Sequence, residues 1–254
     1  MQPEIFDAIS EQERTYWWFV SRRQLILDFF HRTWFRRRNS KPIVHILDVG
    51  CGTGAMLEDF ARIPSVMGFG TDLSPVALRF SRERGQRRVL YADGTQLPFH
   101  PAAFECVVAM DVLEHIPDDL AAMGELWRVC AHGGILLITV PASPWLWTTR
   151  DERLHHKRRY TRAQLVRTAR AAKFDVVKCS YYCAFFFPIM AAIVFFHKLL
   201  GKKPAVKADV PSVNPLVNKL CLGILSCEQW LMRWIDYPFG VSLFCVLRKG
   251  PCPE

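Results

Sequence analysis

A short apolar strand that runs directly into three glycines constrains this chain more than any other feature. The stretch reads Ile46-Leu47-Asp48-Val49-Gly50-Cys51-Gly52-Thr53-Gly54 and leads into a helical pattern. Glycine has no Cβ, so the backbone can turn tightly and approach a ligand at the carboxyl end of a strand. About twenty residues later a second strand, 66–71, ends in Asp72, which suits a carboxylate that accepts ribose hydroxyls. We therefore expect a nucleotide-sized site at the rim of a parallel sheet.

The spacing of the glycines narrows the choice of ligand. The run is Gly-x-Gly-x-Gly, whereas dinucleotide-binding proteins carry Gly-x-Gly-x-x-Gly. No Lys-Ser or Lys-Thr pair follows that would hold a nucleotide triphosphate and its magnesium ion. A pyrophosphate-containing ligand is therefore disfavoured.

Apolar strand runs alternate with helical patterns along the chain, which indicates a parallel sheet covered on both faces. The expected strands cover residues 43–49, 66–71, 89–91, 104–110, 135–140, 174–178 and 241–247. The expected helices cover residues 54–62, 75–85, 118–130 and 161–172. Ser74 and Pro75 suit the N-cap and first turn of the second of these helices.

Five segments, in order, resemble the motifs of the class I S-adenosylmethionine (SAM)-dependent methyltransferases. They are residues 46–54, 72–74, 91–99, 104–117 and 133–141. The resemblance implies a Rossmann-like α/β fold with a seven-stranded, mostly parallel sheet, and SAM as cofactor. It also implies that the cofactor is bordered by Asp48, Gly50, Cys51, Gly52, Gly54, Asp72, Leu73, Asp93, Gly94, Thr95 and Met110. A domain of this fold that binds another adenosine ligand, or none, is the alternative.

Residues 13–23, with Trp17, Trp18 and Phe19, resemble the aromatic lead helix of a bacterial branch of these enzymes. The resemblance places Trp18 and Arg22 beside SAM, with Arg22 near its carboxylate. A guanidinium pairs bidentately with a carboxylate, and aromatic faces attract a sulfonium. The alternative is an amphipathic helix that packs both tryptophans into the core.

Residues 145–161 resemble a second segment of that branch, which lies on the substrate side of the sheet. The resemblance places these residues near the acceptor: Trp147, His156, Arg158, Arg159 and Tyr160. His155 stands where the branch usually has glycine. A histidine can take a proton from a hydroxyl, and paired arginines can hold a phosphate or carboxylate. The alternative is that the two arginines pair with acids while Tyr160 and Thr161 start a helix.

His115 and Asp111, just after the expected fourth strand, are the other catalytic candidates, because the transferred methyl group should lie there. We predict no metal site. The nine cysteines are scattered without a Cys-x-x-Cys pair, which favours reduced thiols in the cytoplasm and disfavours zinc. The nearest imaginable cluster is Asp111, His115 and Asp151.

A long apolar insertion separates the last two expected strands. Residues 179–196 carry no formal charge, and Lys198, Lys202 and Lys203 follow. The segment only reaches the lower limit for crossing a bilayer and is interrupted by Pro188, so we expect an interfacial helix or the wall of an apolar substrate pocket. A second helical stretch covers 216–235. The alternative is a helix pair that packs on the sheet edge and enlarges the core.

The chain is basic, with 33 Lys and Arg against 24 Asp and Glu and a net charge of +9. Part of the excess lies on or just after an expected helix whose apolar positions include Leu25, Ile26, Phe29, Phe30, Trp34 and Phe35. The basic positions are Arg22, Arg23, Arg32, Arg36, Arg37, Arg38 and Lys41. A basic helix with an aromatic face suits an anionic membrane surface. Nucleic acid is the less favoured partner, because the fourth motif lacks the Asn/Asp-Pro-Pro-Tyr/Phe turn of many base-methylating enzymes.

These features predict cap helices in 1–42, a SAM-binding core in 43–180, the apolar insertion in 181–238 and the last strand and tail in 239–254. The expected activity is O-methylation of an amphipathic or lipid-linked small molecule by a cytoplasmic protein at the inner face of the membrane. A soluble small-molecule methyltransferase and a non-catalytic SAM-binding partner protein are the alternatives. The acceptor atom and the oligomeric state do not follow from the sequence.

Overall fold

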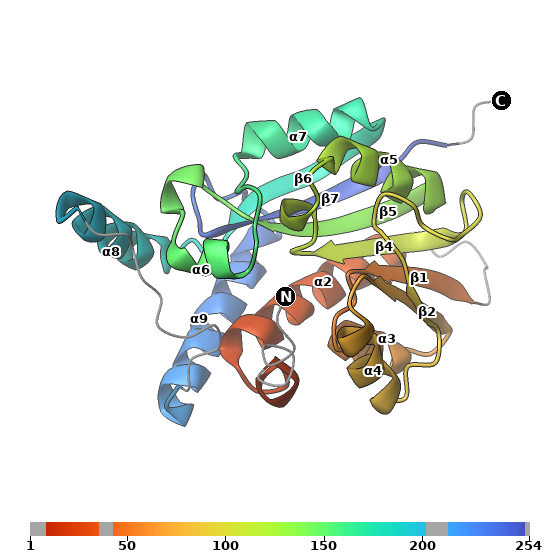
Figure 1. Cartoon of the computed structure of the whole chain (residues 1–254), viewed down its shortest axis with the longest axis horizontal. Coiled ribbons are helices and arrows are strands. Elements are labelled where there is room, and N and C mark those ends of the chain that lie inside the picture. The colour runs from red at the N-terminus through yellow and green to blue at the C-terminus, as the bar shows by residue number, and fades with distance from the viewer. Residues whose placement is uncertain (1–8, 36–42, 202–212, 252–254) are drawn as a thin grey trace.

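The computed structural model describes residues 9–35, 43–201 and 213–251. Its centre is a seven-stranded sheet in the order β3-β2-β1-β4-β5-β7-β6 (Figure 1). The strands are β1 (Val44–Val49), β2 (Val66–Asp72), β3 (Val89–Tyr91), β4 (Phe104–Met110), β5 (Cys130–Pro141), β6 (Phe174–Tyr182) and β7 (Ser242–Lys249). Strand β7 runs antiparallel to both of its neighbours, and the other pairs are parallel. The mostly parallel Rossmann-like sheet expected from the sequence is confirmed.

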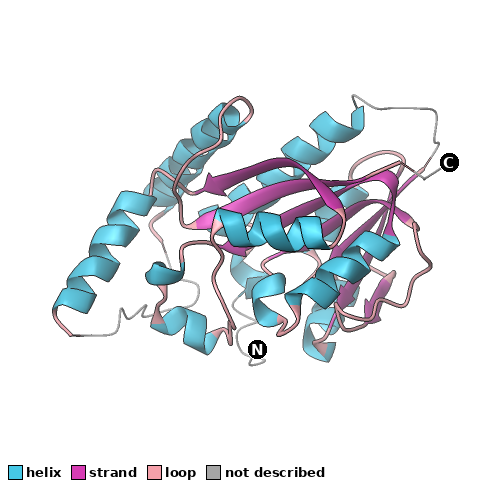
Figure 2. Cartoon of the chain, turned by 90° about the horizontal axis from the view of Figure 1, so that it is seen from above, coloured by secondary structure: helices cyan, strands magenta, loops and turns pink. Residues whose placement is uncertain are grey.

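Helices lie on both sides of this sheet, as Figure 2 shows. They are α2 (Trp17–Phe35), α3 (Ala55–Ala61), α4 (Pro75–Glu83), α5 (Asp119–Val129), α6 (Thr149–Arg153), α7 (Arg162–Ala171), α8 (Phe187–Leu199) and α9 (Pro215–Met232). Two short 3₁₀ turns, η1 (Leu113–His115) and η2 (Pro144–Leu146), follow β4 and β5. Both turns lie at the carboxyl end of a parallel strand, where this class of fold places its ligand.

The central strands of the sheet supply alternate residues to two cores, one on each face. In β1, Ile46 belongs to the core that contains Phe30 of α2, whereas its neighbour Leu47 belongs to the core that contains Leu126 of α5. Successive side chains of a strand point to opposite faces, so a near-continuous apolar run fills both cores. The first core holds α2, α3 and α9 on one face, and the second holds α5 and α7 on the other.

Polar side chains fix where the helices around the site begin. The Ser74 hydroxyl accepts a hydrogen bond from the backbone N–H of Ala77 (3.3 Å), and Pro75 opens α4 as expected. The Asp118 carboxylate caps α5 by accepting from Ala121 N–H (2.9 Å). These caps satisfy N–H groups that have no partner within the helix, and so set the register of each helix against the sheet.

Among the apolar side chains of α2 that are described, Leu25, Ile26, Phe29 and Phe30 do not face solvent. Leu25, Ile26 and Phe30 are fully buried in the first core. These side chains are therefore not available for the membrane contact expected of this face, because they pack on the sheet. The basic residues Arg36, Arg37, Arg38 and Lys41 lie outside the described residues.

The insertion begins later than the sequence indicated, because β6 continues to Tyr182 by pairing with β7. Its second helix, α9, packs beside α2 through the fully buried Leu225 and Met232, which agrees with the sheet-edge alternative. Helix α8 extends away from the sheet (Figure 1), and its Phe195 and Phe196 are 61% and 60% exposed. Among the described residues no helix has the length and apolarity to cross a bilayer. Lys202 and Lys203 lie outside the described residues.

Candidate active site

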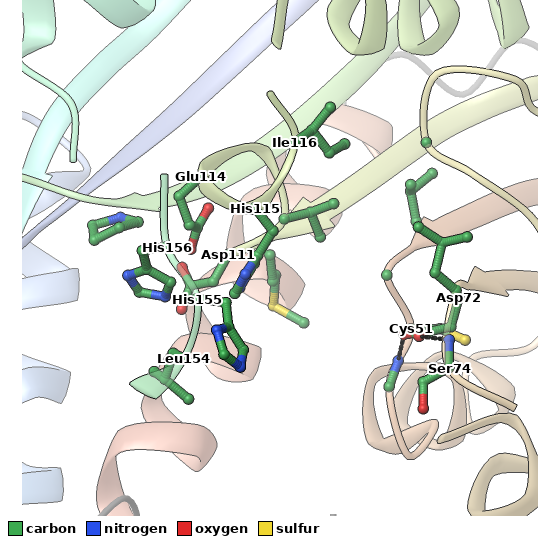
Figure 3. Close-up of a pocket in the computed structure, with 18 of the residues that line it drawn as sticks. Cys51, Asp72, Ser74, Asp111, Glu114, His115, Ile116, Leu154, His155 and His156 are labelled. Carbon is green, nitrogen blue, oxygen red and sulfur yellow. Dashed lines mark hydrogen bonds between the residues drawn. The ribbon is translucent and has the colours of Figure 1, made fainter. Parts of the chain in front are cut away.

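A cavity of about 790 Å³ opens where β1, β2, β4 and β5 end. One side is built by the glycine loop after β1 and by Asp72, and the other by η1 and the loop that follows α6. Figure 3 shows Asp72 and the histidines on opposite sides of this pocket. The cavity is large enough for a nucleoside-sized ligand together with part of a second molecule.

The glycine loop needs its glycines for two different reasons. Gly50 has φ +69°, and a Cβ there would lie 2.4 Å from Val112 Cγ2, so the pocket wall requires the bare backbone. Gly54 has φ +84°, and its Cβ would lie 2.4 Å from the Ser81 hydroxyl. Gly54 does not line the cavity, so its role is close packing between α3 and α4 rather than direct contact with a ligand.

The Asp72 carboxylate is held in a fixed orientation at the end of β2. One oxygen accepts from Gly52 N–H (2.9 Å) and the other from Ser74 N–H (2.8 Å), as Figure 3 shows. Burial raises the pKa of Asp72, and these backbone hydrogen bonds oppose that rise. Each oxygen keeps acceptor capacity toward the cavity. The geometry is that of a carboxylate prepared to accept a ribose diol.

A second carboxylate, that of Asp48, lies beneath the glycine loop. Asp48 is 1% exposed, and neither oxygen has a hydrogen-bond partner among the described residues. Burial, followed by the nearby charge of Asp72, raises the pKa of Asp48 to about 8. Asp48 therefore carries a proton at neutral pH, and that proton can serve as a hydrogen-bond donor at the pocket floor.

Asp93, Gly94 and Thr95, which were expected to border the cofactor, line the same cavity. Asp93 Oδ1 accepts from both the backbone N–H and the hydroxyl of Thr95 (2.8 Å each). Leu73 is half exposed at the rim, and a Cβ on Gly94 would lie 2.9 Å from Ile116 Cδ1. These contacts form a slot with apolar walls and a carboxylate at its edge.

Trp18 and Arg22 of α2 reach the opposite rim. The Arg22 guanidinium lies 5.0 Å from the centre of the Trp18 ring and forms an ion pair with Asp111. Burial lowers the pKa of Arg22 to about 10, so the side chain stays charged. Asp111 also accepts a hydrogen bond from the Thr139 hydroxyl (2.9 Å). Its backbone has φ +53°, a left-handed conformation that is costly for aspartate and typical of functional sites.

Three side chains meet at the acceptor end of the cavity: Glu114, His115 and His156. The imidazoles of His115 and His156 lie with ring centres 4.8 Å apart. His156 Nδ1 is 2.9 Å from Asp151 Oδ1, which fixes its ring. Burial, helped by the nearby His156, lowers the pKa of His115 to about 4, so His115 is uncharged at neutral pH.

Glu114 was not among the candidates from the sequence, although it precedes His115 in the fourth motif. It is fully buried, and burial raises its pKa to about 8. The signal that it belongs to the site is its position in a 3₁₀ turn at the end of a parallel strand. Other lining residues that the sequence reasoning missed are Glu13, Phe19, Thr53, Leu154, His155 and Lys157.

The segment around His156 is braced by residues that were expected to hold the acceptor. Arg159 forms a bidentate pair with Asp151 (2.8 and 2.9 Å). Although burial raises the pKa of Asp151, the hydrogen bonds from His156 and Arg159 outweigh that effect and hold the pKa well below its ordinary value. Lys157 N–H donates to the Glu114 carbonyl (2.7 Å), which joins the loop to η1.

Besides His156, four residues were expected near the acceptor, and three of them do not line the cavity: Trp147, Arg158 and Tyr160. Arg158 pairs with Asp119 (3.0 Å), and the buried Tyr160 hydroxyl donates to the same carboxylate (2.8 Å). The assignment of Arg158 and Tyr160 to direct acceptor contact is not supported, because both side chains interact with the Asp119 carboxylate. The fourth, Arg159, lines the cavity but is paired with Asp151.

Residues 47–138 match the family model described as a methyltransferase domain. The match covers β4, η1 and α5 and includes the glycine loop, so this part of the chain is similar to methyltransferase domains. A SAM-dependent methyltransferase from Thermotoga maritima has the same fold, with a TM-score of 0.58, 15% sequence identity and coverage of 97% of this chain and 95% of that one. At that identity the likeness establishes the fold of the domain.

Curated proteins are similar to part of this chain. A malonyl-[acyl-carrier protein] O-methyltransferase of Herminiimonas arsenicoxydans is 36% identical over 145 residues, or 54% of this chain and 55% of that protein. A ubiquinone biosynthesis O-methyltransferase of Bradyrhizobium sp. (strain ORS 278) is 30% identical over 116 residues, or 42% and 46%. The chain spans about half the length of these relatives, judged by the matched 55% and 46%.

Proposed function

We propose that the protein uses SAM to methylate an oxygen atom of an amphipathic small molecule, such as a lipid-linked saccharide, a polyprenyl derivative or a quinone precursor. The observation that carries the proposal is one continuous cavity with a diol-accepting Asp72 at one end and the His156–Asp151 pair at the other. The O-methyltransferases among the relatives support oxygen as the acceptor atom.

The residues present fit SAM. The backbone of the glycine loop lines the pocket at Gly50, where a Cβ would collide with Val112. The Asp72 carboxylate is oriented for the ribose. Trp18 offers an aromatic face to a sulfonium, and Arg22 lies at the rim for a carboxylate. SAM, when bound, supplies the methyl group, with the S–CH₃ bond breaking as the O–CH₃ bond forms.

The chain's own contribution is to position the acceptor and receive its proton. An O–H acceptor must lose a proton as the methyl group arrives, and two imidazoles are candidates to take it. The low pKa of His115 makes it a weak base. His156 is the stronger candidate, because Asp151 can stabilise its imidazolium form. Arg159 helps indirectly by holding Asp151 in place.

The acceptor class is inferred from the apolar surface of the insertion. Exposed side chains on or beside α8 and α9 include Ile189, Phe195, Phe196, Leu199, Leu216, Leu220, Trp230 and Trp234. A surface of this kind suits contact with a lipid-like molecule or with the membrane that contains it. This argument replaces the one from α2, whose apolar face is buried.

The test is to incubate the protein and methyl-labelled SAM with a whole-cell extract and then partition organic from aqueous material. The proposal predicts labelled product in the organic phase, strongly reduced for His156→Ala and retained for the exposed-surface control His132→Ala. Label confined to RNA or protein would overturn the acceptor class. Absence of label in every fraction would favour a protein that binds SAM without catalysis.

Membrane contact has its own test. The double variant Phe195→Ser and Phe196→Ser should abolish flotation with anionic vesicles and leave binding of S-adenosylhomocysteine (SAH) unchanged, because both side chains are exposed on α8. If the unaltered protein stays at the bottom of the gradient, the membrane part of the proposal is wrong.

A further inference from the structure

A buried acidic side chain without a hydrogen-bond partner among the described residues, near the guanidiniums of Arg22 and Arg159, lies at the acceptor end of the cavity. Glu114 is fully buried, and neither carboxylate oxygen has a hydrogen-bond partner in another described residue. The neighbouring carboxylates are compensated, because Asp111 pairs with Arg22 and Asp151 pairs with Arg159. Buried charges are normally paired or coordinate a metal, since leaving one unpaired is costly. Glu114 therefore needs either a proton or a cation.

Two imidazoles adjoin this carboxylate. One ligand atom from each of Glu114, His115 and His156 can be chosen so that all lie within 4.8 Å of one another. Figure 3 shows the three side chains directed toward the same part of the pocket. Ligand atoms about 2.1 Å from one ion lie about 3 to 4 Å apart. Small side-chain rotations therefore suffice to place all three on one ion.

The surroundings prepare both histidines to act as ligands. Asp151 occupies Nδ1 of His156 (2.9 Å), which leaves Nε2 available. A metal-ligating histidine usually donates its other N–H to a carboxylate or a carbonyl in this way. The backbone bond from Lys157 to Glu114 holds the two ligand-bearing segments together (2.7 Å).

We propose that Glu114, His115 and His156 bind a divalent transition-metal ion. Two imidazoles and one carboxylate form the donor set of catalytic zinc sites and of non-haem iron(II) sites, both of which keep positions open. Magnesium and calcium prefer oxygen ligands throughout. This assignment departs from the expectation of no metal. That expectation considered Asp111 and Asp151, and both of these are paired with arginines.

Glu114, His115 and His156 all line the cavity, so an acceptor oxygen in the cavity could reach an ion that they hold. This use of the site rests on the proposed function. His156 would then act as a ligand and not as the base: the ion would lower the pKa of the acceptor hydroxyl, and the hydroxyl proton would leave to water in the cavity. The ion also lets Glu114 remain buried and charged, because an adjacent divalent cation compensates its charge.

The test is calorimetric titration of chelator-stripped protein with Zn²⁺, together with the visible absorption of bound Co²⁺. The proposal predicts one ion per chain, with binding weakened about tenfold or more in Glu114→Gln, His115→Ala and His156→Ala. The control His132→Ala alters an exposed histidine and should bind as the unaltered protein does. Equal affinity in all five proteins, or no saturable binding, would overturn the site.

Binding of SAH keeps this test separate from that of the proposed function. The three ligand variants should still bind SAH, because Asp72 and the glycine loop lie on the opposite side of the cavity. Normal SAH binding without metal binding in the unaltered protein would refute the metal site alone. Metal binding without SAH binding would refute the proposed function and leave the metal site standing.

Discussion

Replacing Asp48 by Asn should change how the stability of the protein depends on pH. Burial raises the pKa of Asp48 from 3.8 to about 8. Between these values the unfolded chain releases the proton while the folded chain keeps it, so the folded state loses stability as pH rises. Asparagine has no proton to release, and the variant therefore escapes this loss.

The magnitude follows from the size of the pKa change. At about 1.4 kcal/mol per pH unit, the rise from 3.8 to about 8 corresponds to about 6 kcal/mol, of which about 4 kcal/mol is reached at neutral pH. Asp48→Asn should therefore gain stability relative to the unaltered protein by up to about 1.4 kcal/mol for each pH unit in this window. The gain should level off above about pH 8.

The assay is urea unfolding of both proteins at several pH values from about 5 to about 9, without SAM, with the free energy of unfolding extrapolated to zero urea. Thr71→Val is the matched control, because Thr71 is also buried without a hydrogen-bond partner for its hydroxyl but cannot ionise in this range. Its stability difference from the unaltered protein should be the same at every pH. A difference for Asp48→Asn that does not change with pH would refute the reasoning.

Three further substitutions test the packing around the site. Gly54→Ala should destabilise the protein by about 1 to 3 kcal/mol in thermal or urea unfolding, because φ is +84° and the new Cβ would meet Ser81; an unchanged unfolding midpoint would contradict this. Tyr160→Phe should lower the free energy of unfolding by about 1 to 2 kcal/mol, because the hydrogen bond to Asp119 is lost, and should leave the affinity for SAH unchanged. A loss of SAH binding by the folded variant would show that Tyr160 does more than hold the loop in place. Leu126→Ala should lower the free energy of unfolding by about 2 to 5 kcal/mol, because the side chain is 1% exposed in the core beneath α5. A smaller loss would mean that the surrounding side chains move in to fill the cavity.

The glycine loop and the strands around it could be predicted because they depend on local rules. A buried parallel strand needs a continuous apolar run, and a turn with positive φ needs glycine, so both can be read from residues 46–54 alone. The first residues of α4 and α7 could be predicted in the same way, because Ser74 and Thr161 cap these helices. These signals come from neighbours in the sequence and do not require the tertiary structure.

The roles of Arg158, Tyr160 and Glu114 could not be predicted in this way. The Asp119 carboxylate that pairs with Arg158 and Tyr160 comes from a distant part of the chain, and only the folded loop brings it there. The sequence alone does not distinguish Glu114 from a glutamate at the surface. In the fold, η1 places its side chain in the buried wall of the pocket. The orientation of α2 likewise depends on the face of the sheet that it covers.

Titration calorimetry of SAH into the unaltered protein and into Asp72→Asn addresses the binding of SAM most directly. The Asp72 carboxylate is held by Gly52 and Ser74 as an acceptor, so the amide should weaken SAH binding about tenfold or more, while the unaltered protein binds one SAH per chain. If SAH gives no heat with the unaltered protein while a nicotinamide dinucleotide binds with simple saturation, then the pocket does not hold SAM.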